Sequence, residues 1–274
     1  MPSPRQTLKD LGLAPSRYRG QNFLKDPNTA RNLAKLIMDQ GQENILEIGP
    51  GLGALTRPLL DLGANIWAVE LDRGLAESLN GWPESRTGRL KVFQKDILET
   101  DLEETGPGPR TVAGNVPYNI STPILFWFLG QIPKAQSGVF TLQKEMALRL
   151  TAQAGQEHYG RLAVAMNLWL ETRLVLDIPA ASFQPRPKVQ SAAVALKPKT
   201  PPDISLAALG RLTAASFHSR RKTLFNNLGP VYGPEKTRAA LAALAIDPGI
   251  RAERLSPEIF AELAKILDNE PGGA

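Results

Sequence analysis

The 274-residue sequence contains no cysteine and only two histidines, His158 and His218. The absence of cysteine excludes disulfides, thiolate metal sites and cysteine nucleophiles. Because the two histidines are far apart in the chain, a histidine metal cluster or a serine–histidine triad is disfavoured. We therefore expect no metal site, and any catalysis must proceed without a thiolate or an imidazole cluster.

Long hydrophobic runs are also missing. No segment approaches the roughly 18 uncharged apolar residues that a membrane-spanning helix needs. The polar and basic N-terminal segment lacks the apolar core of a secretion signal. We therefore expect a cytoplasmic protein without membrane contact.

The charged residues give the chain a net positive charge. The chain has 32 lysines and arginines against 27 acidic residues, a formal net charge of +5. This excess favours a polyanionic partner without proving one. With 42% hydrophobic and 22% charged residues, the chain has the composition of a globular protein with one large and one small domain.

Composition divides the chain into three stretches. Residues 1–20 carry four basic residues against one acid, with proline and glycine interruptions, so we expect a flexible basic arm. The proline-rich segment 197–203 suits neither helix nor strand and indicates a linker. It separates a large domain over residues 21–200 from a small one over residues 204–274.

The large domain alternates strand and helix patterns. Asn44–Ile48 is typical of a buried strand, and a glycine-rich turn, a helix over 54–62 and a strand over 64–70 complete a βαβ unit. The series predicts an α/β fold with a doubly wound, mostly parallel, Rossmann-like sheet. Further strands are expected at 90–94, 110–114, 137–143, 168–178 and 191–197. The small C-terminal domain is expected to be all-α, with helices at 206–228, 234–245 and 256–267.

The glycine-rich turn has the pattern Glu47-x-Gly49-x-Gly51-x-Gly53 between a strand and a helix. Glycines there permit positive φ and close approach of a ligand to the backbone. The turn alone would serve a dinucleotide, a phosphate or tight packing equally well. Glu70, at the end of the second strand, is placed to accept ribose hydroxyls, as in nicotinamide and S-adenosylmethionine enzymes.

Two acids favour S-adenosylmethionine. Glu47 would repel a pyrophosphate, whereas a cofactor with a sulfonium and an ammonium tolerates a carboxylate there. Asp96, after the third strand, is placed to accept the amino group of adenine. The alternatives are a helix N-cap for Asp96 and a surface acid beside Asp72 for Glu70. Recurrence of acids at the ends of successive strands, where open α/β sheets bind ligands, favours the cofactor interpretation.

The run from Gly114 to Tyr118 places an amide, a rigid carbonyl and a phenol side by side. The side-chain oxygen of Asn115 and the carbonyl of Val116 or Pro117 would accept the two protons of an adenine amine and aim its lone pair at a methyl group. Tyr118 would stack on the base, which is worth roughly 1–3 kcal/mol. An ordinary turn is the competing interpretation.

Two later segments complete the hypothesis. Phe183, followed by a rigid basic loop, would cover the other face of the base, with an ordinary core aromatic as the alternative. Arg220, Arg221 and Lys222 are consecutive on a predicted helix and are expected to bind the phosphates of a polyanionic partner. A solvated helix surface is the alternative there. The same face would include Arg211, Lys236 and Arg238.

Several segments together resemble one family, the ribosomal RNA adenine dimethyltransferases. They are Gln21–Leu24, Glu47–Gly53, Glu70–Asp72, Asp96–Leu98, Asn115–Ser121, Leu142–Glu145 and Ser182–Val189. The resemblance runs in consistent order from about residue 18 to about residue 265. The stretch 217–228 is similar to the bacterial housekeeping group, the kasugamycin-sensitivity type, rather than to the antibiotic-resistance group that modifies the large subunit.

The resemblance implies an S-adenosylmethionine-dependent enzyme that dimethylates two adjacent adenosines in the 3′-terminal hairpin of small-subunit ribosomal RNA. It makes residues 21–200 the cofactor-binding catalytic domain and residues 204–274 the RNA-binding domain. The immature small subunit is the implied partner. Catalysis is assigned to Asn115, Pro117, Tyr118 and Phe183, and cofactor contacts to Asn22, Leu24, Gly49, Gly51, Glu70, Asp96 and Asn115.

Two other functions remain open at this point. One is a ribosome-assembly factor for which binding matters more than methylation. The other is a nicotinamide oxidoreductase, which Glu47 and the Asn-x-Pro-Tyr segment disfavour. We expect a monomer, although no sequence feature requires one.

Overall fold

The computed structural model describes residues 3–13, 21–106 and 110–268. It divides into two compact units, the first formed by Met1–Ala147 with Arg173–Pro198 and the second by Leu148–Thr172 with Lys199–Ala274. The expected large domain over residues 21–200 therefore has an interior segment that clusters with the C-terminal helices instead. The reason is that helix α8 (Arg161–Trp169) contacts helices α9 and α12 of the second unit.

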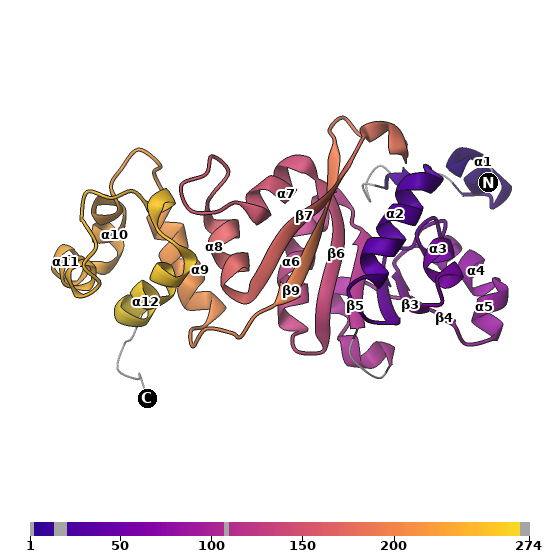
Figure 1. The fold of residues 1–274 in the computed structure, drawn as a ribbon, viewed down its shortest axis with the longest axis horizontal. Coiled ribbons are helices and arrows are strands. Elements are labelled where there is room, and N and C mark those ends of the chain that lie inside the picture. Colours follow the sequence, from indigo (N-terminus) through magenta and orange to yellow (C-terminus); the bar gives the residue numbers. More distant parts are fainter. Residues whose placement is uncertain (1–2, 14–20, 107–109, 269–274) are drawn as a thin grey trace. The chain divides into compact units, whose positions relative to one another are not determined.

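The first unit is built on a seven-stranded sheet with the order β4-β3-β2-β5-β6-β9-β7 (Figure 1). Neighbours from β4 to β6 are parallel, and β9 is antiparallel to β6. This confirms the predicted doubly wound, mostly parallel α/β sheet. The strands are β2 (Asn44–Ile48), β3 (Asn65–Glu70), β4 (Leu90–Gln94), β5 (Arg110–Asn115), β6 (Ala135–Gln143), β7 (Leu170–Ile178) and β9 (Ser191–Pro198).

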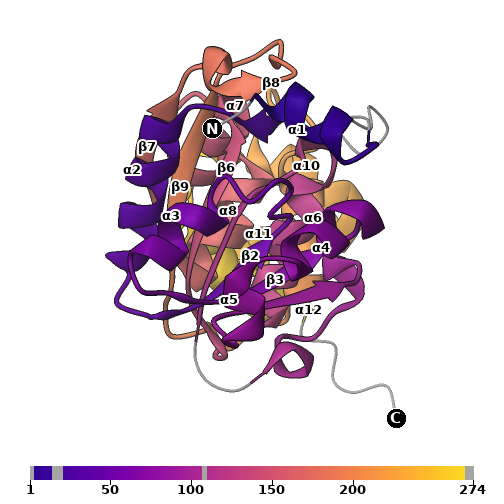
Figure 2. The same ribbon diagram turned by 90° about the vertical axis from the view of Figure 1, so that its right-hand side faces the viewer.

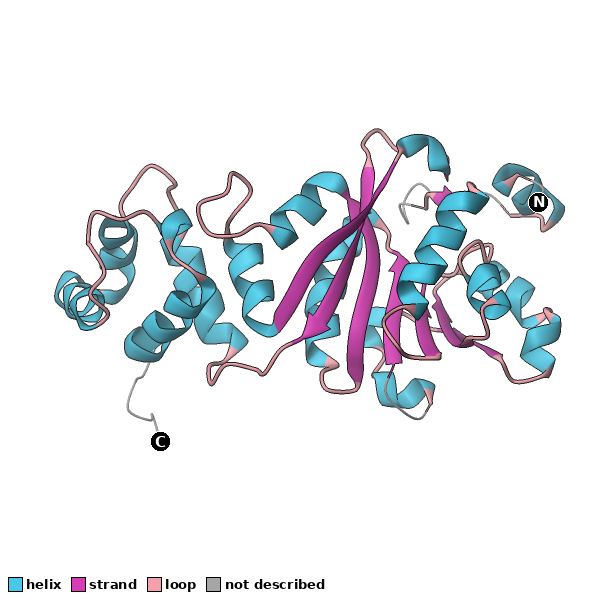
Figure 3. Ribbon diagram, viewed as in Figure 1, coloured by secondary structure: helices cyan, strands magenta, loops and turns pink. Residues whose placement is uncertain are grey.

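Helices lie on both sides of the central strands (Figures 2 and 3). A two-stranded antiparallel sheet joins β1 (Phe23–Leu24) to β8 (Phe183–Gln184). The helices that follow the strands are α2 (Pro27–Met38), α3 (Thr56–Asp61), α4 (Arg73–Asn80), α5 (Pro83–Arg86), α6 (Ser121–Gly130) and α7 (Lys144–Thr151). Single-turn 3₁₀ helices are η1 (Ile97–Glu99), η2 (Leu102–Thr105), η3 (Tyr118–Ile120), η4 (Ala180–Ser182) and η5 (Ala252–Arg254).

One hydrophobic core cluster lies between helices α2 and α3 and the sheet. It contains Leu33 and Ile37 of α2, Leu59 of α3, and Ile45 and Ile66 of the strands, each at most 2% exposed. Because β2, β3, β4 and β5 are parallel, their carboxyl ends lie at one edge of the sheet. The glycine-rich turn and the loops after β4 and β5 are thereby brought together.

The N-terminal segment differs from the expected flexible arm. Pro4–Asp10 forms helix α1, with Ser3 accepting a hydrogen bond from the backbone N of Gln6 at 3.3 Å as its N-cap. Leu8 is buried in a small cluster with Phe23 and Leu75. A capped start, a proline in the first turn and one apolar anchor are sufficient to order a short basic helix. Residues 14–20 of the predicted arm lie outside the described residues.

The second unit contains α9 (Leu206–Ser216), α10 (Leu224–Tyr232), α11 (Pro234–Ala243) and α12 (Pro257–Asp268) in addition to α8. The predicted single helix over residues 206–228 is wrong, because residues 217–223 form a turn between α9 and α10. Asn227 Nδ2 donates to the carbonyls of Ser216 and Ser219, at 2.8 and 3.0 Å, and so satisfies the end of α9. Thr223 Oγ1 accepts from the N of Asn226 and caps α10.

Candidate active site

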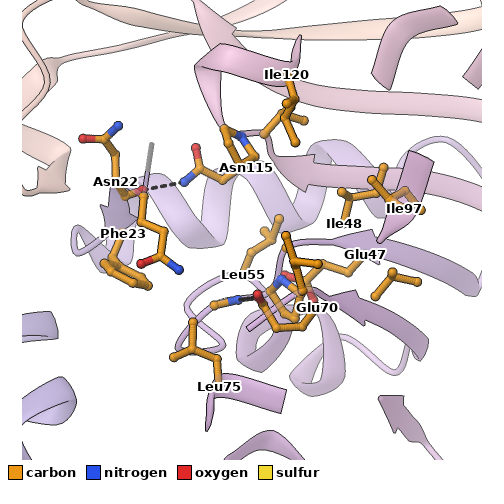
Figure 4. A pocket seen from close by; sticks show the side chains of 18 of the residues that line it. Asn22, Phe23, Glu47, Ile48, Leu55, Glu70, Leu75, Ile97, Asn115 and Ile120 are labelled. Atoms are coloured by element: carbon orange, nitrogen blue, oxygen red, sulfur yellow. Dashed lines mark hydrogen bonds between the residues drawn. The ribbon is translucent and has the colours of Figure 1, made fainter. Parts of the chain in front are cut away.

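A cavity of about 450 Å³ opens in the first unit at the carboxyl ends of the parallel strands (Figure 4). Every residue predicted to contact the cofactor lines it, and so do three of the four residues predicted to act in catalysis. The predicted residues in the lining are Asn22, Leu24, Gly49, Gly51, Glu70, Asp96, Asn115, Pro117 and Tyr118.

The glycine-rich turn forms one wall of the cavity with its backbone. Gly49, Gly51 and Gly53 have φ angles of +62°, +59° and +78°, which residues with a Cβ adopt only with strain. The turn is tied to the neighbouring strand, since the backbone N of Gly51 donates to Glu70 Oε2 at 3.0 Å. A ligand can therefore approach the backbone at Gly49 and Gly51, and the turn is fixed in position.

Glu70 is a buried acid and not the surface carboxylate that was the alternative. It is 6% exposed, and its Oε1 accepts from the backbone N of Asp72 at 2.9 Å while Oε2 holds the glycine turn. Each carboxylate oxygen accepts more than one hydrogen bond. Glu70 can therefore position the turn and still accept from a ligand hydroxyl.

Asp96 is an N-cap, which was the alternative interpretation, and it also lies in the cavity lining, where its predicted contact with adenine stays a prediction. Its Oδ1 accepts from the backbone N of Leu98 at 2.9 Å and caps η1, as the N-cap alternative predicts. The same half-buried side chain lines the cavity. The cap holds the carboxylate in a fixed orientation at the cavity wall.

Glu47 lies deeper in the wall and is 1% exposed. Its Oε2 accepts a hydrogen bond from Thr56 Oγ1 at 2.7 Å. Burial, with a smaller contribution from the charge of Glu70, raises the pKa of Glu47 to about 8 although the Thr56 bond opposes the shift. At neutral pH the ligand-free carboxyl is mainly protonated.

Asn115 ends β5 at the rim of the cavity. Its Nδ2 donates to the backbone carbonyl of Asn22 at 2.7 Å (Figure 4), which leaves the side-chain oxygen as an acceptor. The preceding Gly114 allows β5 to lie close to β2, since a Cβ there would stand 2.5 Å from the carbonyl oxygen of Ile48. A local glycine and a long-range hydrogen bond together fix the amide.

Tyr118 is held by its hydroxyl. The phenol oxygen and Ser191 Oγ are 2.6 Å apart, and Ser191 is fully buried in β9. Burial raises the pKa of the Tyr118 phenol, so it stays protonated at neutral pH.

The Pro117 carbonyl already accepts hydrogen bonds from Ile120 N at 3.2 Å and Ser121 Oγ at 3.3 Å. Of the two carbonyls predicted to accept from the adenine amine, this favours that of Val116.

Phe183 does not take the place predicted for it. It is 1% exposed, pairs with Leu24 in the two-stranded sheet, belongs to the hydrophobic core cluster with α2 and α3, and is not among the residues that line the cavity. The neighbouring backbone is fixed as well, because Lys25 N donates to the carbonyl of Ser182 at 2.8 Å. The core interpretation of Phe183 therefore describes this structure, and the prediction that it covers the base is corrected.

The sequence analysis missed the apolar part of the lining. These side chains have no pattern that separates them from core residues, and only the fold shows that they face a cavity. They are Phe23, Ile48, Leu52, Leu55, Leu75, Ile97 and Ile120. Ser191 and Thr56, which hold Tyr118 and Glu47, were also missed, since a single hydroxyl carries no sequence signal.

The predicted RNA-binding cations lie in the turn between α9 and α10 and not on a helix. Arg220, Arg221 and Lys222 are exposed, and Arg220 Nη2 donates to the carbonyl of Tyr159 at 3.3 Å. Lys222 lines a hollow of about 1150 Å³ in the second unit together with Arg211 and Lys236. Because residues 220–222 are not helical, the three cationic side chains are not distributed around a helix axis as the sequence analysis expected.

The structure also bears on metal-ligand clusters and on membrane-spanning helices. No group of three or more potential metal ligands occurs among the residues that the structure describes. Within the same residues, every helix is too short or too polar to span a bilayer.

Comparison with known proteins identifies the family. The family model described as ribosomal RNA adenine dimethylase matches residues 16–269. The ribosomal RNA small subunit methyltransferase A of Thiobacillus denitrificans is 42% identical over 245 residues, 88% of this chain and 93% of the relative. That of Methylococcus capsulatus is 40% identical and covers 93% of this chain and 98% of the relative.

Solved structures show the same fold. The 23S rRNA methyltransferase ErmE has a TM-score of 0.68 at 28% identity, covering 90% of this chain and all of that one. A dimethyladenosine transferase from Plasmodium falciparum has a TM-score of 0.74 at 24% identity, covering 88% and 95%. The chain therefore belongs to the ribosomal RNA adenine dimethylase family, whose members are S-adenosylmethionine-dependent enzymes that methylate ribosomal RNA.

Proposed function

We propose that this chain dimethylates the exocyclic amines of two adjacent adenosines in the 3′-terminal hairpin of small-subunit ribosomal RNA. The observation that carries the proposal is the Asn115 amide, whose nitrogen is tied to Asn22 and whose oxygen remains as an acceptor beside Tyr118. The choice of the small subunit is supported by relatives of that name at about 40% identity, compared with 28% for a large-subunit enzyme.

The cavity fits the cofactor of the family. Glu70 and Asp96 would accept hydrogen bonds from ribose hydroxyls and an adenine amino group, and Gly49 and Gly51 would let the ligand approach the backbone. The apolar side chains missed by the sequence analysis would contact the faces of an adenine ring. S-adenosylmethionine supplies an electrophilic methyl group when bound.

The protein's own groups orient the target amine. The Asn115 side-chain oxygen and the Val116 carbonyl accept its two protons, which favours a tetrahedral nitrogen with its lone pair free. The nitrogen becomes strongly acidic as its new bond forms, so its proton passes to solvent without a strong base. In the second transfer one proton remains on the amine, and one acceptor is sufficient.

Tyr118 supplies an aromatic surface on which the target base stacks. Its hydroxyl bond to the buried Ser191 holds the ring at the rim of the cavity, where a base taken out of its stack would rest on it. Because Phe183 is in the core, Tyr118 is the one aromatic assigned to the base here. Its raised pKa keeps the phenol neutral in this role.

The partner in the cell would be the immature small subunit, and the enzyme would act as a monomer in the cytoplasm during subunit assembly. The exposed cations at residues 220–222 support RNA binding by the second unit, which contains the predicted RNA-binding domain over residues 204–274. Residues 21–200 supply the cofactor cavity and the target site. Binding during assembly and methylation are compatible activities of such a protein.

Transfer of labelled methyl groups tests the proposal. Unmodified small subunits, large subunits and S-adenosylmethionine are incubated with the enzyme, and nucleosides of the RNA are analysed. We expect N6,N6-dimethyladenosine at two adjacent positions near the 3′ end of small-subunit RNA. Label confined to the large subunit, or none in either, would overturn the assignment.

A further inference from the structure

Glu47 is a buried acid that has no basic partner among the residues that the structure describes. Within these residues it has one hydrogen bond, donated by Thr56, and it lies in the wall of the cavity. Two cations of adjoining segments are paired with other acids. Arg57, next to Thr56 in the chain, pairs with Glu84, and Lys95 of the cavity lining pairs with Glu104. The other titratable side chains in the lining are Glu70, Lys95, Asp96 and Tyr118.

This environment disfavours the charged form of Glu47. A carboxylate removed from water with a single neutral donor and another acid nearby is destabilised relative to the carboxylic acid. The raised pKa of Glu47 agrees with that geometry. A ligand that carries positive charge into the cavity would reverse the preference, because it supplies the missing cation.

The two forms of the cofactor differ in that charge. The methyl donor carries a sulfonium, an ammonium and a carboxylate, whereas the demethylated product has a neutral thioether in place of the sulfonium. On the basis of the proposed function, we propose that Glu47 distinguishes donor from product by ionising when the donor binds and remaining protonated with the product. Donor binding breaks the carboxyl O–H bond and releases that proton to solvent.

The proton balance of turnover follows. When the sulfonium becomes a thioether, Glu47 takes up one proton from solvent while the methylated amine loses one. The net release of one proton per methyl transfer then occurs as the next donor replaces the product. Because donor binding releases a proton below pH 8, donor affinity rises with pH and levels off near that value. Product affinity lacks this dependence on Glu47.

Calorimetry measures the proton directly. Donor and product are each titrated into the protein at pH 7 in phosphate and in Tris, whose ionisation enthalpies differ, so that the difference in heat gives the protons released. We expect close to one more proton for the donor than for the product. The variant Glu47→Gln should lose this difference, and Glu77→Gln, an exposed acid on α4, should keep it.

Proton exchange on the ligand's own amine is common to wild type and variant, so their difference isolates Glu47. Infrared difference spectroscopy of the wild type is the second measurement, and we expect the carboxylic acid C=O band to disappear with donor and persist with product. Equal proton counts for both ligands, or an unchanged band, would overturn the inference. Failure of S-adenosylmethionine to bind would instead overturn the proposed function.

Discussion

Replacement of Asn115 by alanine tests the centre of the proposed mechanism. The change removes two interactions of different kinds. The Nδ2 bond to Asn22 at 2.7 Å is a structural hydrogen bond, and its loss should lower the free energy of unfolding by about 1 kcal/mol. In the proposed mechanism, the Oδ1 atom accepts a hydrogen bond from an amine that becomes positively charged in the transition state.

The catalytic effect follows from that charge. A hydrogen bond to a charged group is worth about 1.5–3 kcal/mol, so its loss should reduce kcat by about 10- to 150-fold. Loss of orientation of the amine would add to this factor. RNA affinity should be nearly unchanged, because one neutral amide contributes little beside the phosphate contacts.

Single-turnover methyl transfer and filter binding of the RNA separate the two effects. Asn80→Ala, an exposed asparagine at the end of α4, controls for the substitution itself, and thermal melting checks folding. The reasoning would be refuted if Asn115→Ala kept more than half of the wild-type kcat. Loss of RNA affinity in proportion to kcat would equally refute it.

Three other substitutions test separate parts of the structure. Gly114→Ala brings a Cβ to 2.5 Å from the Ile48 carbonyl and should cost about 1–3 kcal/mol of stability in denaturant unfolding; an unchanged midpoint would contradict the close approach of β5 and β2. Phe183→Ala should cost about 3–5 kcal/mol in the same assay, as expected of a core aromatic; a loss of turnover without destabilisation would restore its predicted role at the base. Arg221→Ala should lower the slope of log RNA affinity against log salt by about one with unchanged melting temperature, and an unchanged slope would exclude a phosphate contact.

The sequence was most informative where function depends on short segments. The glycine turn, Glu70, Asp96 and the Asn115 to Tyr118 segment all lie in the cavity lining. Each lies at or just after the carboxyl end of a strand, so the parallel sheet brings them to one edge without any further information. The predicted strands and the fold class depend on the same local periodicity and were confirmed.

The errors have a common origin in long-range contacts. Asn227 terminates α9 by bonding the carbonyls of Ser216 and Ser219, and an Ala- and Leu-rich pattern does not show such a bond. Leu8 orders the N-terminal helix through contact with Phe23 and Leu75. The local sequence pattern favoured a continuous helix over 206–228 and a flexible N-terminal arm. Contacts with residues outside each segment's own pattern ended the first helix early and ordered the arm.

By itself, the sequence determined which chemical groups this protein brings to its site. Acids, glycines and the amide follow one another at strand ends, and strand formation is governed by the apolar runs themselves. Tertiary structure alone decided how these groups are held and charged. The bonds of Asn115 to Asn22 and of Tyr118 to Ser191 join segments far apart in the chain, and the burial that neutralises Glu47 and removes Phe183 from the cavity depends on packing from several elements at once.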